Sequence, residues 1–204
     1  RLGYVLFYGE GYYFQHPEQI LAFNKGGMSF HGGLIGALLA GIAAAKLTRI
    51  PYLTLADLGC IGAPLGLLFG RCANFINGEL WGAPTDAAWG VVFGGAAGTM
   101  PRHPSQLYEA FLEGVVIFAV LYLLSRRMPP RPRGTFLGTF LVMYGCFRFL
   151  VEFVREPDAQ LGYLWGGWLT MGQLLSVPLI LVGAGVLVYA LVVKNPQKGL
   201  PEMQ

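Results

Sequence analysis

The stretch TFLGTFLVMYGCFRFLVEFVRE, residues 135–156, decides how the rest of this chain is interpreted. A helix needs about 20 mainly apolar residues to cross a bilayer, and the run from Thr135 to Val154 meets that length. Its second half nevertheless carries Arg148 and Glu152, and Arg155 follows directly. Ionisable side chains are costly to bury in hydrocarbon, so their presence here indicates a functional site.

The composition of the whole chain also indicates a membrane protein. The 204 residues are 54% hydrophobic and 12% charged, about half of the ~25% charged residues usual in soluble domains. A net charge of +3, without a basic stripe, does not predict nucleic-acid binding. The cysteines, at positions 60, 72 and 146, fit neither a disulfide framework nor a metal site. We therefore expect no metal, no cofactor and no nucleic-acid partner.

Apolar segments without strand-like alternation predict an all-α integral membrane protein, a polytopic helical bundle. We expect about five spans, and residues 1–8 resemble the tail of an earlier one. We accordingly expect residues 1–204 to form a single transmembrane domain that lacks its N-terminal spans. The predicted spans are Ser29–Leu47, Leu53–Gly70, Gln106–Leu124, Thr135–Val154 and Trp168–Val193.

Lysines and arginines between the spans predict the orientation, because cytoplasmic loops are enriched in them. They cluster after the first, third and fifth spans. Because successive spans cross the membrane in opposite directions, these three clusters lie on the same side. Residues 71–105 are then an extracytoplasmic loop region, and residues 155–167 face the same side. The basic residues are Lys46, Arg49, Arg126, Arg127, Arg131, Arg133, Lys194 and Lys198, and the outer segments hold the possible interfacial residues Trp81, Trp89, Trp165 and Trp168.

Ionisable and amide side chains of three predicted spans collect at this outer face, which predicts one site there. Asp57 and Glu113 are the exceptions. The group comprises His31, Arg71, Asn74, Glu79, Arg148, Glu152 and Arg155.

Arg148 and Glu152 are four residues apart, so they share a helix face with Tyr144. The planar fork of an arginine matches a phosphate, and arginines from two helices near the headgroups suit an anionic lipid. Two plainer interpretations remain: Arg148 and Glu152 form a structural ion pair, and Arg71 snorkels to the headgroups.

Two histidines are candidates for the site. His31, in FHGGL, can accept a proton near neutral pH, although a helix cap or an interfacial position is an equal alternative. The motif RHPSQLYE, residues 102–109, begins a helix at Pro104 and Ser105. Its His103, Tyr108 and Glu109 could line the same site.

Four motifs together resemble the prolipoprotein diacylglyceryl transferase family of bacteria. They are GRCANFINGELWG, FHGGL, RHPSQLYE and RFLVEFVREPDAQ, and the similarity covers nearly the whole chain. The resemblance implies about seven spans in the bacterial cytoplasmic (inner) membrane, with the active site toward the outer face. It implies transfer of the diacylglyceryl group of phosphatidylglycerol to the lipobox cysteine thiol of a preprolipoprotein. The implied partners are therefore phosphatidylglycerol, the lipobox peptide and the surrounding membrane lipid. The products are a thioether and glycerol phosphate.

The resemblance also assigns site residues. Arg71 matches the family arginine that binds phosphatidylglycerol. The residues that match positions important for activity are His31, Asn74, Glu79, Gly82, Tyr144, Arg148 and Glu152. We expect His31, Arg71, Glu79, Tyr144, Arg148 and Glu152 to be catalytic, and Arg71, Asn74, Gly82, His103 and Arg155 to bind substrate. The chain departs from the family in having Ala73 in place of a usual glycine, and the family's first spans, with an early tyrosine motif, are absent.

The expected mechanism uses the substrate thiol as nucleophile and arginines to stabilise the leaving phosphate. His31 is the first candidate for the general base and Tyr144 the second. Glu79 and Glu152 are expected to orient the arginines, although either could take the proton. Two other functions remain open: a transporter or binder of anionic lipid, and a scaffold that only packs against partner helices.

Overall fold

The computed structural model describes residues 1–8, 11–22, 24, 26–27, 29–127, 130–156, 164 and 169–197. The chain divides into two compact units, residues 1–55 and 56–200. Each unit is described by itself below. Trp165 and Trp168, two of the expected interfacial tryptophans, and Lys198 lie outside the described residues.

The first unit consists of short helices and one long helix. It contains α1 (Leu2–Tyr8), α2 (Tyr12–Gln15), η1 (Pro17–Gln19) and α3 (Phe30–Thr48). α1 packs closely on α3, because a Cβ atom at Gly3 would lie 3.1 Å from the Cα of Gly32. The Ser29 side chain caps α3 by accepting from the backbone N–H of Gly32 at 3.3 Å. His31 therefore lies in the first turn of α3.

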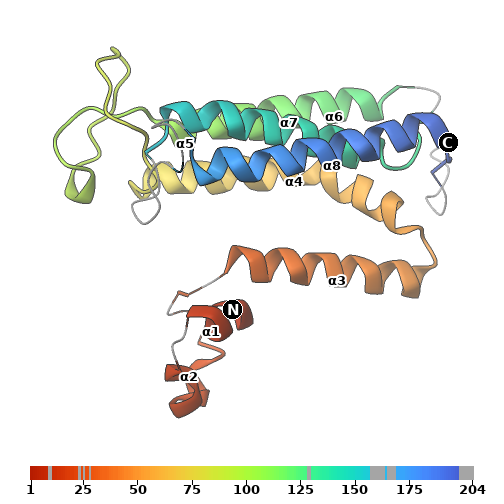
Figure 1. The fold of residues 1–204 in the computed structure, drawn as a ribbon, viewed down its shortest axis with the longest axis horizontal. Helices are drawn as coiled ribbons and strands as arrows, with labels where there is room; N and C mark the ends of the chain where they lie inside the picture. Colours follow the sequence, from red (N-terminus) through yellow and green to blue (C-terminus); the bar gives the residue numbers. More distant parts are fainter. Residues whose placement is uncertain are drawn as a thin grey trace. The chain divides into compact units, whose positions relative to one another are not determined.

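The second unit is a bundle in which α4, α6, α7 and α8 run side by side (Figure 1). α4, which begins before the boundary between the units, is long, and α5 leads through η4 into α6. η4 is a π-helical turn, and such turns are frequent at functional sites. The elements are α4 (Tyr52–Ile76), η3 (Gly95–Ala97), α5 (Ser105–Glu109), η4 (Ala110–Val116), α6 (Ile117–Ser125), α7 (Thr135–Val151), η5 (Glu152–Val154) and α8 (Met171–Val193).

Four helical stretches are long and apolar enough to cross a membrane: Tyr52–Ile76, Ser105–Ser125, Thr135–Val154 and Met171–Val193. They confirm the predicted all-α, multi-pass class. The first predicted span coincides with α3, a helix of 19 residues. Among the described residues, β structure is limited to isolated bridges in the loop between α4 and α5, at Arg155 and at Leu169.

Glycines allow α7 and α8 to pack backbone against backbone. A Cβ atom at Gly138 would lie 2.8 Å from the backbone nitrogen of Leu187. At Gly183 it would lie 2.7 Å from the Cβ of Leu141. Membrane helices associate through such small residues, because lipid supplies no hydrophobic driving force between them. These contacts join the first half of α7 to the second half of α8, so the two helices pack antiparallel.

Asp57, an exception to the one-sided pattern of charges, has a structural role. Its carboxylate accepts from the backbone N–H groups of Gly134 at 2.7 Å and Leu137 at 2.8 Å. It also accepts from the Gln197 side chain at 2.7 Å. These bonds satisfy donors at the start of α7 that have no partner within the helix. Asp57 thus caps α7 across the bundle.

Candidate functional site

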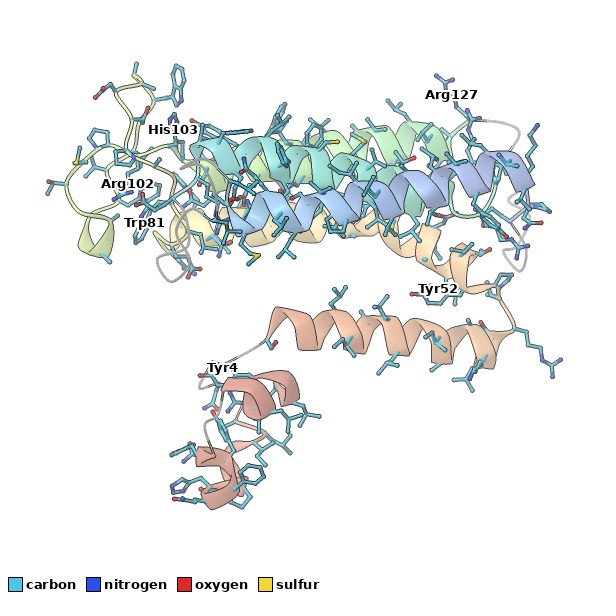
Figure 2. All side chains as sticks on the ribbon, viewed as in Figure 1. Tyr4, Tyr52, Trp81, Arg102, His103 and Arg127 are labelled. Atoms are coloured by element: carbon cyan, nitrogen blue, oxygen red, sulfur yellow. The ribbon has the colours of Figure 1, made fainter. Side chains whose placement is uncertain are left out.

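The candidate site lies where α4, α5 and α7 meet, next to the loop at one end of the second unit. Figure 2 shows Trp81, Arg102 and His103 in that loop and Arg127 at the opposite end. The basic loop after α6 and the predicted site are therefore at opposite ends of this unit. Which of the two ends faces the cytoplasm stays a prediction from the lysine and arginine positions.

Glu109, at the end of α5, is the centre of the site. Its Oε2 lies 2.6 Å from the Nε of Arg71 on α4. Its Oε1 lies 3.2 Å from Nη1 of Arg148 on α7 and 3.1 Å from Nη1 of Arg155. One carboxylate thus contacts arginines from two separate helices and from the segment that follows α7. A buried charge is tolerated when it is paired in this way.

Two further carboxylates complete the group, which we call the arginine–glutamate cluster: Arg71, Glu109, Glu113, Arg148, Glu152 and Arg155. The Oε2 of Glu113 lies 3.8 Å from Nη2 of Arg71. The Oε2 of Glu152 lies 2.7 Å from Nη1 of Arg148. Three positive and three negative formal charges leave the cluster neutral.

The two signs of charge in the cluster differ in their exposure. The glutamate side chains are 0–6% exposed, whereas those of the arginines are 11–17% exposed. The arginine side chains are thus more exposed than the glutamate side chains of the cluster. Guanidinium donors held close together suit a phosphate, which they bind in bidentate fashion.

Glu113 was not predicted to belong to this group, and Glu109 was expected only to line it. The two residues are four apart on a predicted span, a spacing that puts them on one face. That spacing was the available signal, because two carboxylates on one face inside a membrane need positive partners. The structure corrects the interpretation of Glu113 as an exception to the pattern.

Glu79 differs from expectation. Its carboxylate accepts from the side-chain amides of Asn74 at 2.8 Å and Asn77 at 3.3 Å rather than from an arginine. The bond from Asn74, and then that from Asn77, lower the pKa of the Glu79 carboxyl below its ordinary value. Glu79 is therefore ionised at neutral pH and closes the turn after α4. The carboxylates that contact arginines of the cluster are those of Glu109, Glu113 and Glu152.

The RHPSQLYE motif fastens this turn to α5. The Ser105 hydroxyl donates to the carbonyl of Leu80 at 3.2 Å, and the Gln106 side chain donates to that of Glu79 at 2.6 Å. The hydroxyl and the amide of these two residues are fully buried. Two motifs that are far apart in the sequence thus form one structural unit beside Glu109.

Gly82 lies between two other chain segments. Its N–H donates to the carbonyl of His103 at 2.9 Å, and it pairs with Arg155 in an isolated bridge. A Cβ atom at this position would lie 2.6 Å from the backbone oxygens of His103 and Val154. Only glycine fits there, and the pairing fixes the position of Arg155 within the cluster.

His103 belongs to a hydrogen-bonded chain of aromatic residues. The Trp89 indole donates to the Tyr108 hydroxyl at 2.7 Å, and that hydroxyl lies 3.2 Å from Nδ1 of His103. Because the hydroxyl accepts from Trp89, its own proton is free to point at Nδ1. The neutral imidazole then carries its proton on Nε2. With this tautomer, the Nε2–H of His103 is left as a donor in the loop.

The two candidates for the general base lie in different units. Tyr144 lies one turn before Arg148 on α7, and its ring stacks on Phe140 with centroids 5.9 Å apart. His31 lies on α3 in residues 1–55. The structure thus puts Tyr144 on α7, the helix that carries Arg148 of the cluster. The role of His31 stays a prediction.

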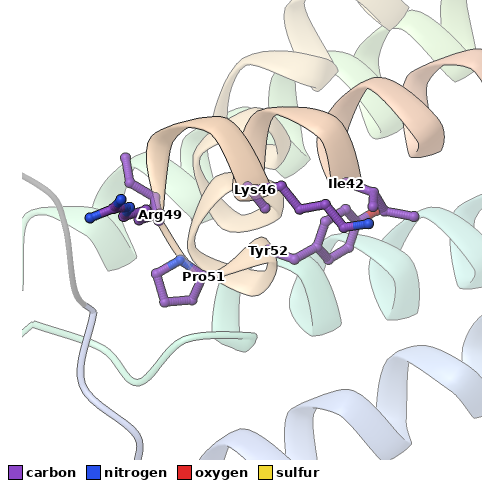
Figure 3. Close-up of a pocket in the computed structure, with 7 residues that line it drawn as sticks. Ile42, Lys46, Arg49, Pro51 and Tyr52 are labelled. Carbon is purple, nitrogen blue, oxygen red and sulfur yellow. The ribbon is translucent and has the colours of Figure 1, made fainter.

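Figure 3 draws a hollow in the first unit. It has a volume of about 350 Å³ and is lined by seven residues where α3 turns into α4, among them Lys46, Arg49 and Tyr52. None of the predicted site residues lines it. Within the described ranges, no three His, Cys, Asp or Glu side chains gather to hold a metal ion.

We expect Gly82→Ala to destabilise the protein and to displace Arg155. The added methyl group meets two backbone oxygens that cannot move independently, and overpacking of this kind costs about 1–3 kcal/mol. Thermal unfolding in detergent measures this loss. Gly185→Ala in α8 is the control, because its Cβ atom would meet nothing within 4 Å. Equal unfolding temperatures for the two variants would contradict the tight pairing at Gly82.

Comparison with known proteins identifies the family. The model of the family described as prolipoprotein diacylglyceryl transferase matches residues 1–189. A phosphatidylglycerol–prolipoprotein diacylglyceryl transferase of Geobacter sulfurreducens is 56% identical over 183 residues, which are 90% of this chain and 69% of the relative. Proteins of the same name from Methylococcus capsulatus and Azotobacter vinelandii are each 53% identical over 93% of this chain and 71% of their own lengths. The chain therefore belongs to the prolipoprotein diacylglyceryl transferase family.

Proposed function

We infer that this chain is a membrane transferase that moves the diacylglyceryl group of phosphatidylglycerol onto a prolipoprotein. The family match and the names of the relatives support this activity. The observation that carries it is the arginine–glutamate cluster, in which three guanidinium groups share Glu109 and remain partly exposed. A phosphodiester headgroup is the anion that such a site in a membrane would bind.

The proposed acceptor is the thiol of the lipobox cysteine in the preprolipoprotein. Its sulfur attacks the glycerol carbon that is bonded to the phosphate ester. A C–S bond forms, and the C–O bond to phosphate breaks with its electron pair leaving on oxygen. Glycerol phosphate departs, and the thiol proton passes to a base or to the leaving phosphate. A free thiol has a pKa near 8.5, so removal of this proton assists the reaction at neutral pH.

Arg71 and Arg148 are proposed to bind the phosphate and to stabilise the charge that grows on it. Donors that are already oriented stabilise a transition state more effectively than water does, because they need no reorganisation. The shared contact with Glu109 holds both side chains in place before substrate binds. Arg155, on the same carboxylate, is proposed as a third phosphate-binding group.

The remaining predicted residues are proposed to shape the outer rim of the site. Asn74 and Glu79 hold the turn after α4, and Gly82 joins that turn to the segment that carries Arg155. The Nε2 donor of His103 is proposed to contact the lipid headgroup. The loop of residues 83–104 is proposed to admit the lipobox peptide.

The proposed location is the bacterial inner membrane, with the site toward the outer face. The basic loop after α6 is then cytoplasmic, as the distribution of lysine and arginine predicts. Arg127, in that loop, and His103, beside the site, lie at opposite ends of the second unit (Figure 2). Phosphatidylglycerol of the outer leaflet would place its phosphate at the depth of the cluster.

A transporter of anionic lipid is the alternative function, and it requires polar groups along a path to the other face. Asp57 is one of the two exceptions to the one-sided pattern of charges and would be such a group. Its carboxylate is instead occupied by the backbone N–H groups of Gly134 and Leu137 and by Gln197. The described residues therefore favour the transferase.

We expect Arg71→Ala to lower turnover by about 10²–10³-fold, the usual effect of removing one oriented donor. The assay mixes the protein in proteoliposomes with phosphatidylglycerol and a lipobox peptide and follows the release of glycerol phosphate. Arg127→Ala is the matched control, because Arg127 is exposed at the opposite end of the unit. Release that does not need the cysteine of the peptide, or that survives in Arg71→Ala, would contradict the proposal.

The base is tested by comparing His31→Gln with Tyr144→Phe. Loss of a general base lowers turnover by about 10²–10⁴-fold, and the loss shrinks at high pH, where the thiol ionises unaided. We expect this pH-dependent loss in His31→Gln. Near-parental turnover of His31→Gln at neutral pH would reject His31 as the base, and a pH-dependent loss in Tyr144→Phe alone would assign the role to Tyr144.

A further inference from the structure

The start of α8 is shaped around the carboxylate of Glu152. The Thr170 hydroxyl donates to the Oε1 of Glu152 at 2.9 Å, and the other carboxylate oxygen lies 2.7 Å from Nη1 of Arg148. Glu152 thus connects α8 to an arginine of the cluster. Thr170 is 4% exposed and Glu152 is 7% exposed, so water does not compete strongly for this contact.

The direction of the Thr170 hydroxyl is fixed by a second hydrogen bond. Its oxygen accepts from the backbone N–H of Gln173 at 3.3 Å, and the Gln173 side chain accepts from the Thr170 N–H at 3.1 Å. This reciprocal capping box holds the threonine side chain in one rotamer. Since an ionised carboxylate can only accept, the hydroxyl proton points at Glu152.

Gly172 provides independent evidence that this turn accommodates the carboxylate. A Cβ atom at Gly172 would lie 2.5 Å from Oε1, 2.6 Å from Cδ and 2.8 Å from Oε2 of Glu152. Any side chain at this position would push the carboxylate away. The carboxylate also lies at the N-terminal end of α8, where the backbone N–H groups carry partial positive charge.

We propose that Thr170 and Gly172 are positioning residues, which hold Glu152 and, through it, direct the Arg148 guanidinium toward the substrate phosphate. This inference rests on the proposed function, in which Arg148 stabilises the leaving group. Arg148 contacts Glu109 through the same Nη1 atom that contacts Glu152. Two carboxylates therefore contact one guanidinium group, Glu109 as a hydrogen-bond acceptor and Glu152 as an ion-pair partner, and α8 holds the second of them.

The test compares Thr170→Val with Thr170→Ser in the glycerol phosphate assay. Valine keeps the shape of the side chain but loses the hydroxyl. We therefore expect kcat to fall by about 10–100-fold, because small misplacements of catalytic groups cause losses of this size. The change in KM should be smaller. Serine keeps the hydroxyl and should restore most of kcat. Gly172→Ala should resemble Thr170→Val. Parental kcat in Thr170→Val would overturn the proposal.

Two controls separate positioning from a merely structural effect. Gln173→Met breaks half of the capping box without touching Glu152, and it should leave kcat close to parental. Thr170→Val should cost little in an Arg148→Lys background, because the direction of the guanidinium no longer matters there. Equal losses in both backgrounds, or a kcat loss in Gln173→Met like that in Thr170→Val, would overturn the proposal.

A double-mutant cycle on thermal unfolding keeps the inference testable apart from the reaction. Thr170→Val and Glu152→Gln, alone and combined, measure whether the two side chains interact. Coupling supports the contact, and its absence overturns the inference whatever the turnover. If the parental protein released no glycerol phosphate while the coupling was present, the proposed function would fail and the contact would stand.

Discussion

The contact of one buried carboxylate with three guanidinium groups is the constraint on which the rest of the site depends. Arg71, Arg148 and Arg155 would repel one another at this distance without Glu109. Bringing any of these charges out of water costs several kcal/mol, which only close pairing and hydrogen bonding offset. The ends of α4, α5 and α7 therefore have to meet where they do. The outer loop is fastened to the same place through Ser105 and Gln106.

This arrangement also explains how the site can bind an anion although the cluster is neutral overall. The carboxylate side chains are almost fully buried, whereas the arginine side chains are partly exposed. A phosphate that approaches therefore meets oriented donors first. Glu109 stabilises the empty site, and the remaining donors of each arginine are available to the phosphate. The structure of the cluster thus prepares the site before the lipid arrives, which is what electrostatic stabilisation of a transition state requires.

The sequence predicts the bundle well, because long apolar runs leave few alternatives to membrane helices. It also predicts that Arg148 and Glu152 share a helix face, since their spacing follows directly from helix geometry. The partners of Arg71 were harder to find. They depend on the π-helical turn after Glu109 and on the close approach of Gly114 to Leu68 on α4. Neither follows from local sequence preference, and both are consequences of packing between helices.

Asp57 shows the same limit. A lone carboxylate in an apolar span suggests function, yet the carboxylate caps a neighbouring helix by accepting from Gly134 and Leu137. Only the packing of α4 against the start of α7 reveals this. His31 is the opposite case, because its predicted role comes from its motif and the histidine lies in the other unit. Contacts within one helix can be inferred from spacing, whereas contacts between helices need the structure.

The central claim is that Glu109 holds the arginines ready for a phosphate, and the affinity of Glu109→Gln for phosphatidylglycerol tests it most directly. Binding to the detergent-solubilised protein would be measured by calorimetry, with Asp86→Asn as the control, since Asp86 is exposed on the loop. If Glu109 merely neutralised the arginines, its loss would free positive charge and tighten binding. The account predicts weaker binding by about tenfold or more, because losing the charge-assisted contacts that order the guanidinium groups costs at least about 1.5 kcal/mol. Unchanged or tighter binding in a folded Glu109→Gln variant would contradict it.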